Sequence, residues 1–424
     1  MKLSAEQLEA IDLATTLSNR ICCVTGQAGT GKTTILKHVY AELAERFDLV
    51  RVQVTKDTYE DQSAVMLCAP TGRAATRIEE ATGIPAMTIH RMLRFNAPVI
   101  DDDGKEIEPL PAYDKLNPMP YDVVIVDEAS MVATELYRKI IDALKPGAVI
   151  RFFGDLNQLP PIGDEGGSPF GIALKKYPSV TLTENFRSGD DIIDASDKVI
   201  RNRIPSANNG VLIHRANRGG DGMEQVLKLC RDTDFTAMEN QIICPTRANK
   251  NGSFAISTQI QTLFNPSKEK LTVFRTERYN GETQTIATAF KRGDKVIWTK
   301  NDYTLGLFNG QIGRLLDWQE GTGDMLINFD GQDHHIPHTA KRFDPFKQVE
   351  YSYDPRTQID LAYAITTHKA QGSQFDTVMY VVAFSRAGTR QNVYTALTRA
   401  KNKIVIIDIG RALSQAIMNK TVVD

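Results

Sequence analysis

The segment Gly26-Gln27-Ala28-Gly29-Thr30-Gly31-Lys32-Thr33-Thr34 decides the fold of this chain. A short apolar run, Ile21–Val24, precedes it and a helical pattern, residues 35–40, follows it. This order of strand, glycine loop and helix is the context that a phosphate-binding loop requires. The glycines let backbone N–H groups point at phosphate oxygens, and the helix start adds partial positive charge. A glycine-rich turn that binds nothing is the competing interpretation, but the correct flanks favour nucleotide binding.

This loop supplies most of the candidate nucleotide-binding residues. The Lys32 ammonium would reach the β- and γ-phosphates, and the Thr33 hydroxyl would bind Mg²⁺. The other residues would line the phosphates mainly with their backbone: Gly26, Ala28, Gly29, Thr30, Gly31 and Thr34. The sequence therefore predicts a nucleotide and Mg²⁺ as cofactors.

Length and composition are those of a globular protein with more than one domain. The chain has 424 residues, 42% hydrophobic and 24% charged, which is enough for two or three domains that each bury a core. No apolar run approaches the roughly 20 residues of a membrane span, and the N-terminus lacks a signal-peptide core. The net charge of −2 does not by itself indicate a nucleic-acid-binding protein. It does not argue against one either, because a lined channel needs only local positive charge.

The cysteines and histidines give no sign of a metal site. Four of the five cysteines sit in apolar runs, which predicts buried free thiols in a reducing, cytoplasmic compartment. The five are Cys22, Cys23, Cys68, Cys230 and Cys244. His334, His335 and His338 lie close together, and we interpret them as part of a polar loop rather than as metal ligands.

Strands and helices alternate in two series, which predicts two α/β domains. Strands of the first series are expected at Ala64–Ala69, Val123–Val126 and Val149–Phe153, with helices at 4–20, 73–82 and 88–95. Strands of the second series are expected at Gln241–Cys244, Val378–Val382 and Lys403–Ile407. Between residues 290 and 350 the pattern changes to short β-like runs, which suggests an inserted small β-barrel. Residues 96–121 hold five prolines and the acidic run 101–103, so they look like an insertion in the first domain.

Polar residues follow two of these strands. Asp127 and Glu128 close the strand 123–126, where Asp127 would hold Mg²⁺ and Glu128 would accept a proton from the attacking water. Gln158, past the strand 149–153, would hydrogen-bond the γ-phosphate or that water. A solvated strand end and an ordinary loop are the competing interpretations, and the phosphate loop upstream favours the catalytic one.

The blocks of sequence, read together, resemble superfamily 1B DNA helicases of the RecD/Dda branch. The matching blocks run in family order from residue 7 to about 401: Gln7, Gly26–Thr34, Ala69–Ala75, Thr88–Leu93, Val126–Met131, Gly154–Pro161, Leu182–Arg187, Thr366–Ser373 and Val393–Ala400. The resemblance implies two RecA-like parallel-sheet motor domains with ATP between them, and a small SH3-like β-barrel inserted in the second. It also implies that residues 96–121 fill the place of the hairpin that splits the duplex.

The resemblance assigns further ATP-site residues. Gln7 matches the adenine-recognising glutamine, and Gln371 and Gly372 match nucleotide-contacting positions of the second domain. Arg187 and Arg399 match arginine fingers, guanidinium groups that the second domain would bring to the γ-phosphate. Ordinary surface arginines are the alternative.

The candidate nucleic-acid contacts lie at strand ends and helix starts, where hydroxyls, N–H groups and a lysine suit phosphates without reading sequence. They are Pro70, Thr71, Gly72, His90, Phe95, Thr367, His368 and Lys369. Phe95 and His90 could stack on bases, although core packing competes for Phe95.

We therefore predict an ATP- and Mg²⁺-dependent DNA helicase that moves along single-stranded DNA and unwinds duplex, with 5′→3′ polarity implied only by the resemblance. The expected domains are: residues 1–95 and 122–185, first RecA-like domain; 96–121, inserted pin; 186–289 and 352–424, second RecA-like domain; 290–351, inserted barrel.

Expected partners are single-stranded DNA, DNA junctions and a single-stranded-DNA-binding or other replication or recombination protein. We expect a monomer in a bacterial cytoplasm, or a phage-encoded one in its host. A translocase that does not separate strands, an ATP-clamped binding module and an RNA substrate remain alternatives.

Overall fold

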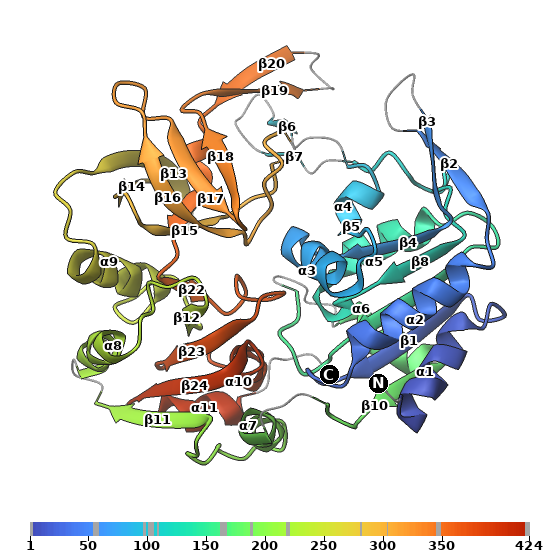
Figure 1. Ribbon diagram of the computed structural model, residues 1–424, viewed down its shortest axis with the longest axis horizontal. Helices are drawn as coiled ribbons and strands as arrows, with labels where there is room; N and C mark the ends of the chain where they lie inside the picture. Colours follow the sequence, from blue (N-terminus) through green and yellow to red (C-terminus); the bar gives the residue numbers. More distant parts are fainter. Residues whose placement is uncertain are drawn as a thin grey trace. The chain divides into compact units, whose positions relative to one another are not determined.

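The computed structural model describes residues 3–53, 59–95, 99–100, 106–107, 110–161, 168–186, 190–217, 221–279, 282–302, 304–344 and 349–419. These residues form two compact units, Met1–Ile193 and Asp194–Asn419. Each unit contains a parallel sheet with helices (Figure 1), so the predicted α/β class is confirmed. In the part of the chain that is described, no helix is both long and apolar enough to cross a bilayer.

The first unit is built on a six-stranded parallel sheet. Its strand order is β10 (Ser179–Leu182), β1 (Ile21–Gly26), β9 (Val149–Gly154), β8 (Val123–Val126), β4 (Val65–Ala69) and β5 (Met87–Thr88). The residues of β4, β8 and β9 are all buried, as expected of strands covered on both faces. Because β9 lies between β1 and β8, the ends of these three strands bring the phosphate loop, Asp127 and Gln158 to one edge of the sheet.

Helices α1 (Ala5–Thr15), α2 (Lys32–Ala44), α3 (Gly72–Thr82), α4 (Ile89–Met92), α5 (Thr134–Asp142) and α6 (Pro169–Lys176) accompany this sheet, with a 3₁₀ turn at Ala129–Met131. Helix α1 ends earlier than the expected residue 20. The guanidinium of Arg151, fully buried on β9, donates to the carbonyl oxygens of Ala14 (2.6 Å) and Thr16 (2.8 Å) and so caps the end of the helix.

Two short antiparallel pairs in the first unit were not predicted as strands. Strands β2 (Leu49–Gln53) and β3 (Tyr59–Ser63) pair with each other where the sequence predicts only a polar interval. Within the predicted insertion, β6 (Val99–Ile100) pairs with β7 (Glu106–Ile107). The acidic run 101–103 lies outside the described residues, so its expected role as a pin tip stays a prediction.

The parallel sheet of the second unit has five strands, in the order β11 (Val211–Ala216), β24 (Ala400–Ile409), β23 (Phe375–Val382), β12 (Asn240–Cys244) and β22 (Ala364–Thr366). Its helices are α8 (Asp221–Asp232), α9 (Ser253–Phe264), α10 (Arg390–Leu397) and α11 (Ala412–Met418), while α7 (Asp190–Ile200) runs across the boundary between the units. The three strands expected from apolar runs are present, and β11 and β22 flank them.

A second, antiparallel sheet lies within the same unit, in the order β18 (Gln332–Ile336), β17 (Met325–Phe329), β16 (Ile312–Trp318), β15 (Lys295–Trp298) and β21 (Ile359–Leu361). Trp298, Leu315 and Phe329 are buried in its core. Two hairpins accompany it, β13 (Leu271–Tyr279) with β14 (Glu282–Phe290) and β19 (Ala340–Asp344) with β20 (Val349–Tyr353). Figure 1 shows these strands grouped apart from the parallel sheet. The expected β-rich insertion is therefore present, and its closure into a barrel stays a prediction.

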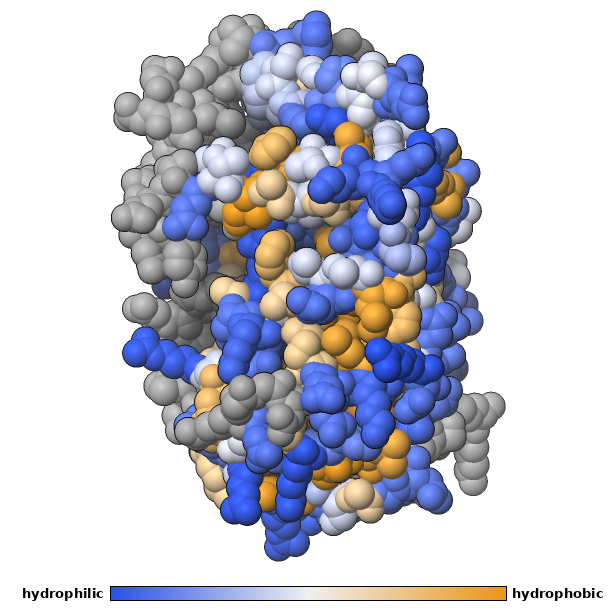
Figure 2. Space-filling view, turned by 90° about the vertical axis from the view of Figure 1, so that its left-hand side faces the viewer, coloured by the Kyte–Doolittle hydropathy of each residue, from blue (hydrophilic) through white to orange (hydrophobic). Residues whose placement is uncertain are grey.

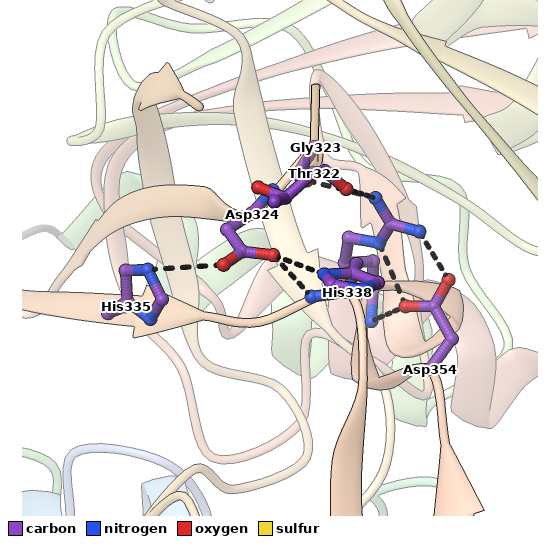
Figure 3. Close-up of polar contacts among 7 residues, drawn as sticks. Thr322, Gly323, Asp324, His335, His338 and Asp354 are labelled. Carbon is purple, nitrogen blue, oxygen red and sulfur yellow. Dashed lines mark hydrogen bonds and ion pairs between the residues drawn. The ribbon is translucent and has the colours of Figure 1, made fainter. Parts of the chain in front are cut away.

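Two of the three clustered histidines lie in this antiparallel sheet, and His338 follows strand β18. His334 and His335 are on β18, so the expectation of a polar loop was wrong for them. Figure 3 shows His335 and His338 turned toward Asp324, whose Oδ1 accepts from the His338 backbone N–H (2.8 Å) and lies 2.7 Å from His338 Nδ1. Hydrogen bonds and the two imidazoles hold the Asp324 pKa below its ordinary value. These contacts connect the turn before β17, which carries Asp324, to the segment that follows β18.

The surface of the second unit mixes apolar and polar side chains. Figure 2 shows apolar residues gathered at mid-height among hydrophilic ones, on the side where α8 and α9 lie. Phe254 and Leu263 on α9 are among the exposed large apolar side chains. Exposed apolar residues are ordinary on globular surfaces, so this mixture alone marks no site.

Candidate functional site

The phosphate loop connects β1 to α2 with the backbone geometry that glycine permits. Gly29 and Gly31 have φ values of +90° and +83°, in the left-handed region that favours glycine. A Cβ at Gly31 would collide with the Gln7 amide nitrogen, so the position also needs a residue without a side chain. The sequence therefore folds locally as the predicted strand, glycine loop and helix.

Lys32 and Thr30 stabilise the curl of this loop. The Lys32 ammonium, in the first turn of α2, donates to the carbonyl oxygens of Gly26 (2.7 Å) and Gln27 (2.9 Å). The Thr30 hydroxyl donates to the same Gln27 carbonyl at 2.9 Å. Thr33 and Thr34 are half-buried beside Lys32 at the start of the helix. The charge of Lys32 is thus placed at the loop, where phosphate oxygens would bind.

Gln7 connects helix α1 to the loop. Its side chain is 1% exposed, and its amide donates to the carbonyl oxygen of Thr30 (3.2 Å). Its Oε1 accepts from the Ser4 backbone N–H (3.1 Å) in a capping box that starts α1. The predicted adenine contact therefore requires that the amide exchange these hydrogen bonds.

The segment before Arg187 is bonded to the loop from the other side. Asn185 Nδ2 donates to the carbonyl oxygen of Ala28 (2.8 Å), and the Phe186 N–H donates to that of Gly29 (2.9 Å). The half-exposed Phe186 ring lies beside Gly31. This segment lies within the first compact unit, Met1–Ile193, and the expected domain boundary at residue 185 stays a prediction. Arg187 itself lies outside the described residues.

Asp127 and Glu128 follow β8 at the same edge of the sheet. The Glu128 N–H donates to Asp127 Oδ1 (2.8 Å), and Glu128 has a φ of +50°, a strained backbone for a residue with a side chain. Burial and the neighbouring Glu128 charge raise the pKa of Asp127, while the positive charges of Lys32 and Arg77 oppose the rise. The loop and the acidic pair follow strands of one parallel sheet and lie at the same edge of it.

Three buried polar atoms at this edge have no hydrogen-bond partner among the residues that the structure describes. They are Glu128 Oε2, Ser130 Oγ and Gln158 Oε1. An unsatisfied buried polar atom costs about 1–3 kcal/mol, so three of them after adjacent strands favour a site that a ligand completes. Carboxylate, hydroxyl and amide oxygens fit a hydrated Mg²⁺ and an attacking water. Ser130 was missed by sequence reasoning, because a serine in a turn carries no distinctive signal.

The candidate ATP-site residues of the second unit lie at and after α10 and in the loop before Ser373. Arg399 is 2% exposed, and its guanidinium donates to the carbonyl oxygens of Thr395 (3.1 Å) and Ser373 (3.2 Å) and to the Thr398 hydroxyl (3.1 Å). Gln371 is buried in the loop that ends at Ser373, and Gly372 has a φ of +73°. Since these residues and Lys32 belong to different units, their meeting at one nucleotide stays a prediction.

The candidate nucleic-acid contacts of the first unit lie after β4 and around α4. Pro70 and Thr71 are half-buried, Gly72 is buried, and the Thr71 hydroxyl accepts from the Ala74 N–H (3.2 Å) to cap α3. The His90 and Phe95 rings lie 4.7 Å apart. Phe95 packs against the core and carries the Lys139 ammonium 5.3 Å from its ring centre, so the ring serves core packing in this structure.

The candidate contacts of the second unit divide into one that is buried and two that are partly exposed. Thr367 is fully buried, and its hydroxyl donates to Asn392 Oδ1 (2.6 Å). The expectation that this hydroxyl contacts phosphate is therefore corrected. His368 is partly exposed and burial lowers its pKa, whereas Lys369 Nζ donates to Asp360 Oδ2 at 2.9 Å.

The five cysteines are all buried and free, as expected. Burial raises the pKa of Cys22 to about 11 and that of Cys23 to about 12. Among the described ranges, no group of three or more histidine, cysteine, aspartate or glutamate side chains is arranged to hold a metal ion by itself. A metal at Asp127 would therefore take part of its shell from other oxygens.

The fold and the loop define a class: nucleoside-triphosphate-binding proteins with a phosphate loop on a parallel α/β sheet. Residues 2–216 match the family model described as an AAA domain, and residues 361–407 match the UvrD-like helicase C-terminal domain. The chain belongs to this AAA-domain family, and it is similar to the RecD/Pif1-like helicases of superfamily 1B. The predicted resemblance is thereby confirmed.

Two curated relatives match nearly the whole chain. The ATP-dependent RecD2 DNA helicase of Deinococcus radiodurans is 31% identical over 405 residues, which are 95% of this chain and 48% of the relative. The RecBCD enzyme subunit RecD of Mycobacterium tuberculosis H37Rv is 26% identical over 470 residues, 98% of this chain and 71% of the relative. The chain thus spans about half the length of the RecD2 relative.

Solved structures share the fold. The Bacteroides Pif1 helicase in complex with ADP-AlF3 and single-stranded DNA gives a TM-score of 0.57 at 20% identity, over 96% of this chain and 92% of that one. The Candida albicans Pif1 helicase gives 0.59 at 18% identity, over 99% and 98%. These similarities confirm two RecA-like parallel-sheet domains.

Proposed function

We propose that this chain hydrolyses ATP and uses the cycle to move along single-stranded DNA and separate duplex strands. The observation that carries the proposal is the edge of the first sheet. Three buried polar atoms there have no hydrogen-bond partner among the described residues, and the charge of Lys32 opposes the rise in the pKa of Asp127. The names of the relatives, an ATP-dependent DNA helicase and a Pif1 helicase with single-stranded DNA, support the same substrates.

The residues of the first unit have distinct roles in this proposal. The loop N–H groups and Lys32 bind the phosphates, and Thr33 and Asp127 would hold Mg²⁺, which supplies neutralisation of the phosphate charge when bound. Glu128 accepts the proton of the attacking water, and Gln158 with Ser130 orients that water. The exposed Phe186 ring, beside Gly31 and near Gln7, would stack on the adenine.

The second unit would complete the site. Arg399, with Gln371 and Gly372, would approach the γ-phosphate and stabilise the charge that develops there, and Arg187 would do so from the segment bonded to the loop. The DNA backbone would be contacted by two residues of the second unit and four of the first: His368 and Lys369, and Pro70, Thr71, Gly72 and His90. We further propose 5′→3′ movement, action as a monomer at DNA junctions, and a cytoplasmic location, which the five buried thiols support.

The test is ATP hydrolysis with and without single-stranded DNA, beside strand separation of duplexes with 5′ or 3′ tails in DNA and in RNA. We expect Mg²⁺-dependent turnover that DNA stimulates, and unwinding of the 5′-tailed DNA duplex. Replacement of Lys32 by alanine should lower turnover about 10²–10³-fold, because one charge at the transferred phosphate is lost. Stimulated turnover without strand separation would instead favour a translocase that does not unwind.

A further inference from the structure

Asn392 joins three elements of the second unit in a fully buried hydrogen-bond network. Its Oδ1 accepts from the Thr367 hydroxyl (2.6 Å) and from the Tyr380 hydroxyl (3.0 Å). Thr367 lies in the loop after β22, Tyr380 on β23 and Asn392 in the first turn of α10, and all three are 0% exposed. Asn392 Nδ2 has no partner among the described residues, so the two hydrogen bonds to Oδ1 carry the connection between the three elements.

One end of the network lies beside the candidate DNA contacts. Thr367 immediately precedes His368 and Lys369, the two partly exposed residues of this loop. Its backbone N–H donates to the carbonyl oxygen of Cys244 (3.0 Å), so the loop start is also bonded to the end of β12. Thr367 is bonded to Asn392 and is followed directly by His368 and Lys369. A DNA phosphate that moves either of these two residues therefore displaces Thr367 through the backbone.

The other end leads to Arg399. Helix α10 carries Thr395, whose carbonyl oxygen accepts from Arg399 Nε (3.1 Å). Arg399 Nη1 also donates to the carbonyl oxygen of Ser373, at the far end of the loop that begins at Thr367. The loop 367–373 is thus bonded to α10 at its start, through Asn392, and to Arg399 at its end.

We infer that Asn392 is a positioning residue that couples DNA contact at the loop 367–373 to the placement of the Arg399 guanidinium. The inference rests on the proposed function and adds a route within one unit: displacement of His368 and Lys369 moves Thr367, Thr367 moves α10 through Asn392, and α10 moves Arg399. The coupling is a free-energy difference between two positions of the loop, α10 and Arg399, which move together. It is lost when the hydrogen bond between the loop and α10 is lost. The Asn392 side chain is fully buried, so its role in this route is to connect the two elements.

The experiment compares ATP turnover at saturating single-stranded DNA with turnover in its absence. Thr367→Val keeps the shape of the side chain and removes the hydroxyl, whereas Thr367→Ser keeps the hydroxyl. We expect the valine variant and Asn392→Leu to lose about tenfold in DNA stimulation, within the range usual for coupled sites, and the serine variant to retain it. The double variant should lose no more than either single one, because both remove the same bond.

Tyr380→Phe is the matched control, since it removes the other hydroxyl on Asn392 and leaves the bond between the loop and α10. We expect it to keep DNA stimulation within about twofold. Thermal unfolding of each variant identifies any that fails to fold, and DNA affinity in the presence of a non-hydrolysable ATP analogue shows whether binding itself is lost.

Folded Thr367→Val with wild-type stimulation would overturn the inference, as would equal losses in Tyr380→Phe and Thr367→Val. Wild-type protein without any DNA stimulation would instead contradict the proposed function, so the two failures are distinguishable.

Discussion

Two buried polar clusters, one in each unit, differ in how far their hydrogen bonds are satisfied. At the edge of the first sheet, Glu128, Ser130 and Gln158 bury polar atoms that no described residue satisfies. In the second unit, Asn392 Oδ1 accepts from the hydroxyls of Thr367 and Tyr380, although Asn392 Nδ2 has no partner among the described residues, and Arg399 is bonded to the main chain around it. Unsatisfied atoms favour a ligand that completes them, and a bonded network transmits displacement. We propose that the first edge binds and reacts with the nucleotide, and that the hydrogen bonds of Asn392 in the second unit transmit displacement.

Glu128→Gln should have the largest effect, because it removes the proton acceptor and keeps the shape of the side chain. We expect ATP turnover to fall about 10³-fold, as for other general bases, with nucleotide affinity within a few-fold of the wild type. The measurement is steady-state hydrolysis beside equilibrium binding of a fluorescent ATP analogue.

The control is Glu135→Gln on α5, an exposed glutamate whose ion pairs with Arg138 and Lys139 are 3.9 and 3.8 Å long. This variant should retain wild-type turnover. If Glu128→Gln also retained it, the reactive role of the first edge would be refuted.

Arg151 sharpens the comparison, because it is a bonded buried group within the first unit. Its guanidinium donates to four carbonyl oxygens, those of Ala14, Thr16, Asn19 and Ile150. Arg151→Met should lower the free energy of unfolding by about 3 kcal/mol, because several buried acceptors lose a charged donor. Chemical denaturation measures the loss.

The exposed variant Lys198→Ala, which removes a surface ion pair with Asp194, should cost about 0.5 kcal/mol or less. Equal losses in Arg151→Met and Lys198→Ala would show that the buried network contributes nothing beyond a surface contact.

Asp127→Asn should change stability less than Arg151→Met, and with the opposite sign. Because the pKa of Asp127 is raised in the folded protein, the native state binds more protons than the unfolded state, and stability falls as the pH rises above the ordinary carboxylate range. Removing this charge should therefore raise the free energy of unfolding at neutral pH by about 1–2 kcal/mol, while weakening Mg²⁺-dependent turnover. Urea denaturation in Mg²⁺-free buffer at pH 4.5 and pH 7 compares the two proteins, and a variant that is less stable at pH 7 would contradict the argument.

The sequence predicted those parts of the fold that signal locally. The phosphate loop and the mainly apolar strands 64–69, 123–126 and 149–153, the last interrupted by Arg151, needed no tertiary information. The pair β2 and β3 was missed because polar edge strands such as Tyr59–Ser63 lack a periodic apolar face. Helix α1 ends at Thr15 because of Arg151, which is distant in sequence.

The candidate site was predictable where residue chemistry and strand ends coincide, as at Lys32, Asp127 and Glu128. It was not predictable where burial decides the role. A threonine beside His368 suggests a phosphate contact, yet Thr367 is fully buried against Asn392. Likewise, nothing in the sequence distinguishes Ser130 from an ordinary turn serine, or shows that Phe186 lies beside Gly31.

The most direct test of the central claim is Mg²⁺-ATP hydrolysis by the wild-type protein and the Lys32→Ala variant, each with single-stranded DNA. The account predicts DNA-stimulated turnover in the wild type and its near-complete loss in a variant that unfolds at the same temperature. Turnover that persists in folded Lys32→Ala would contradict it.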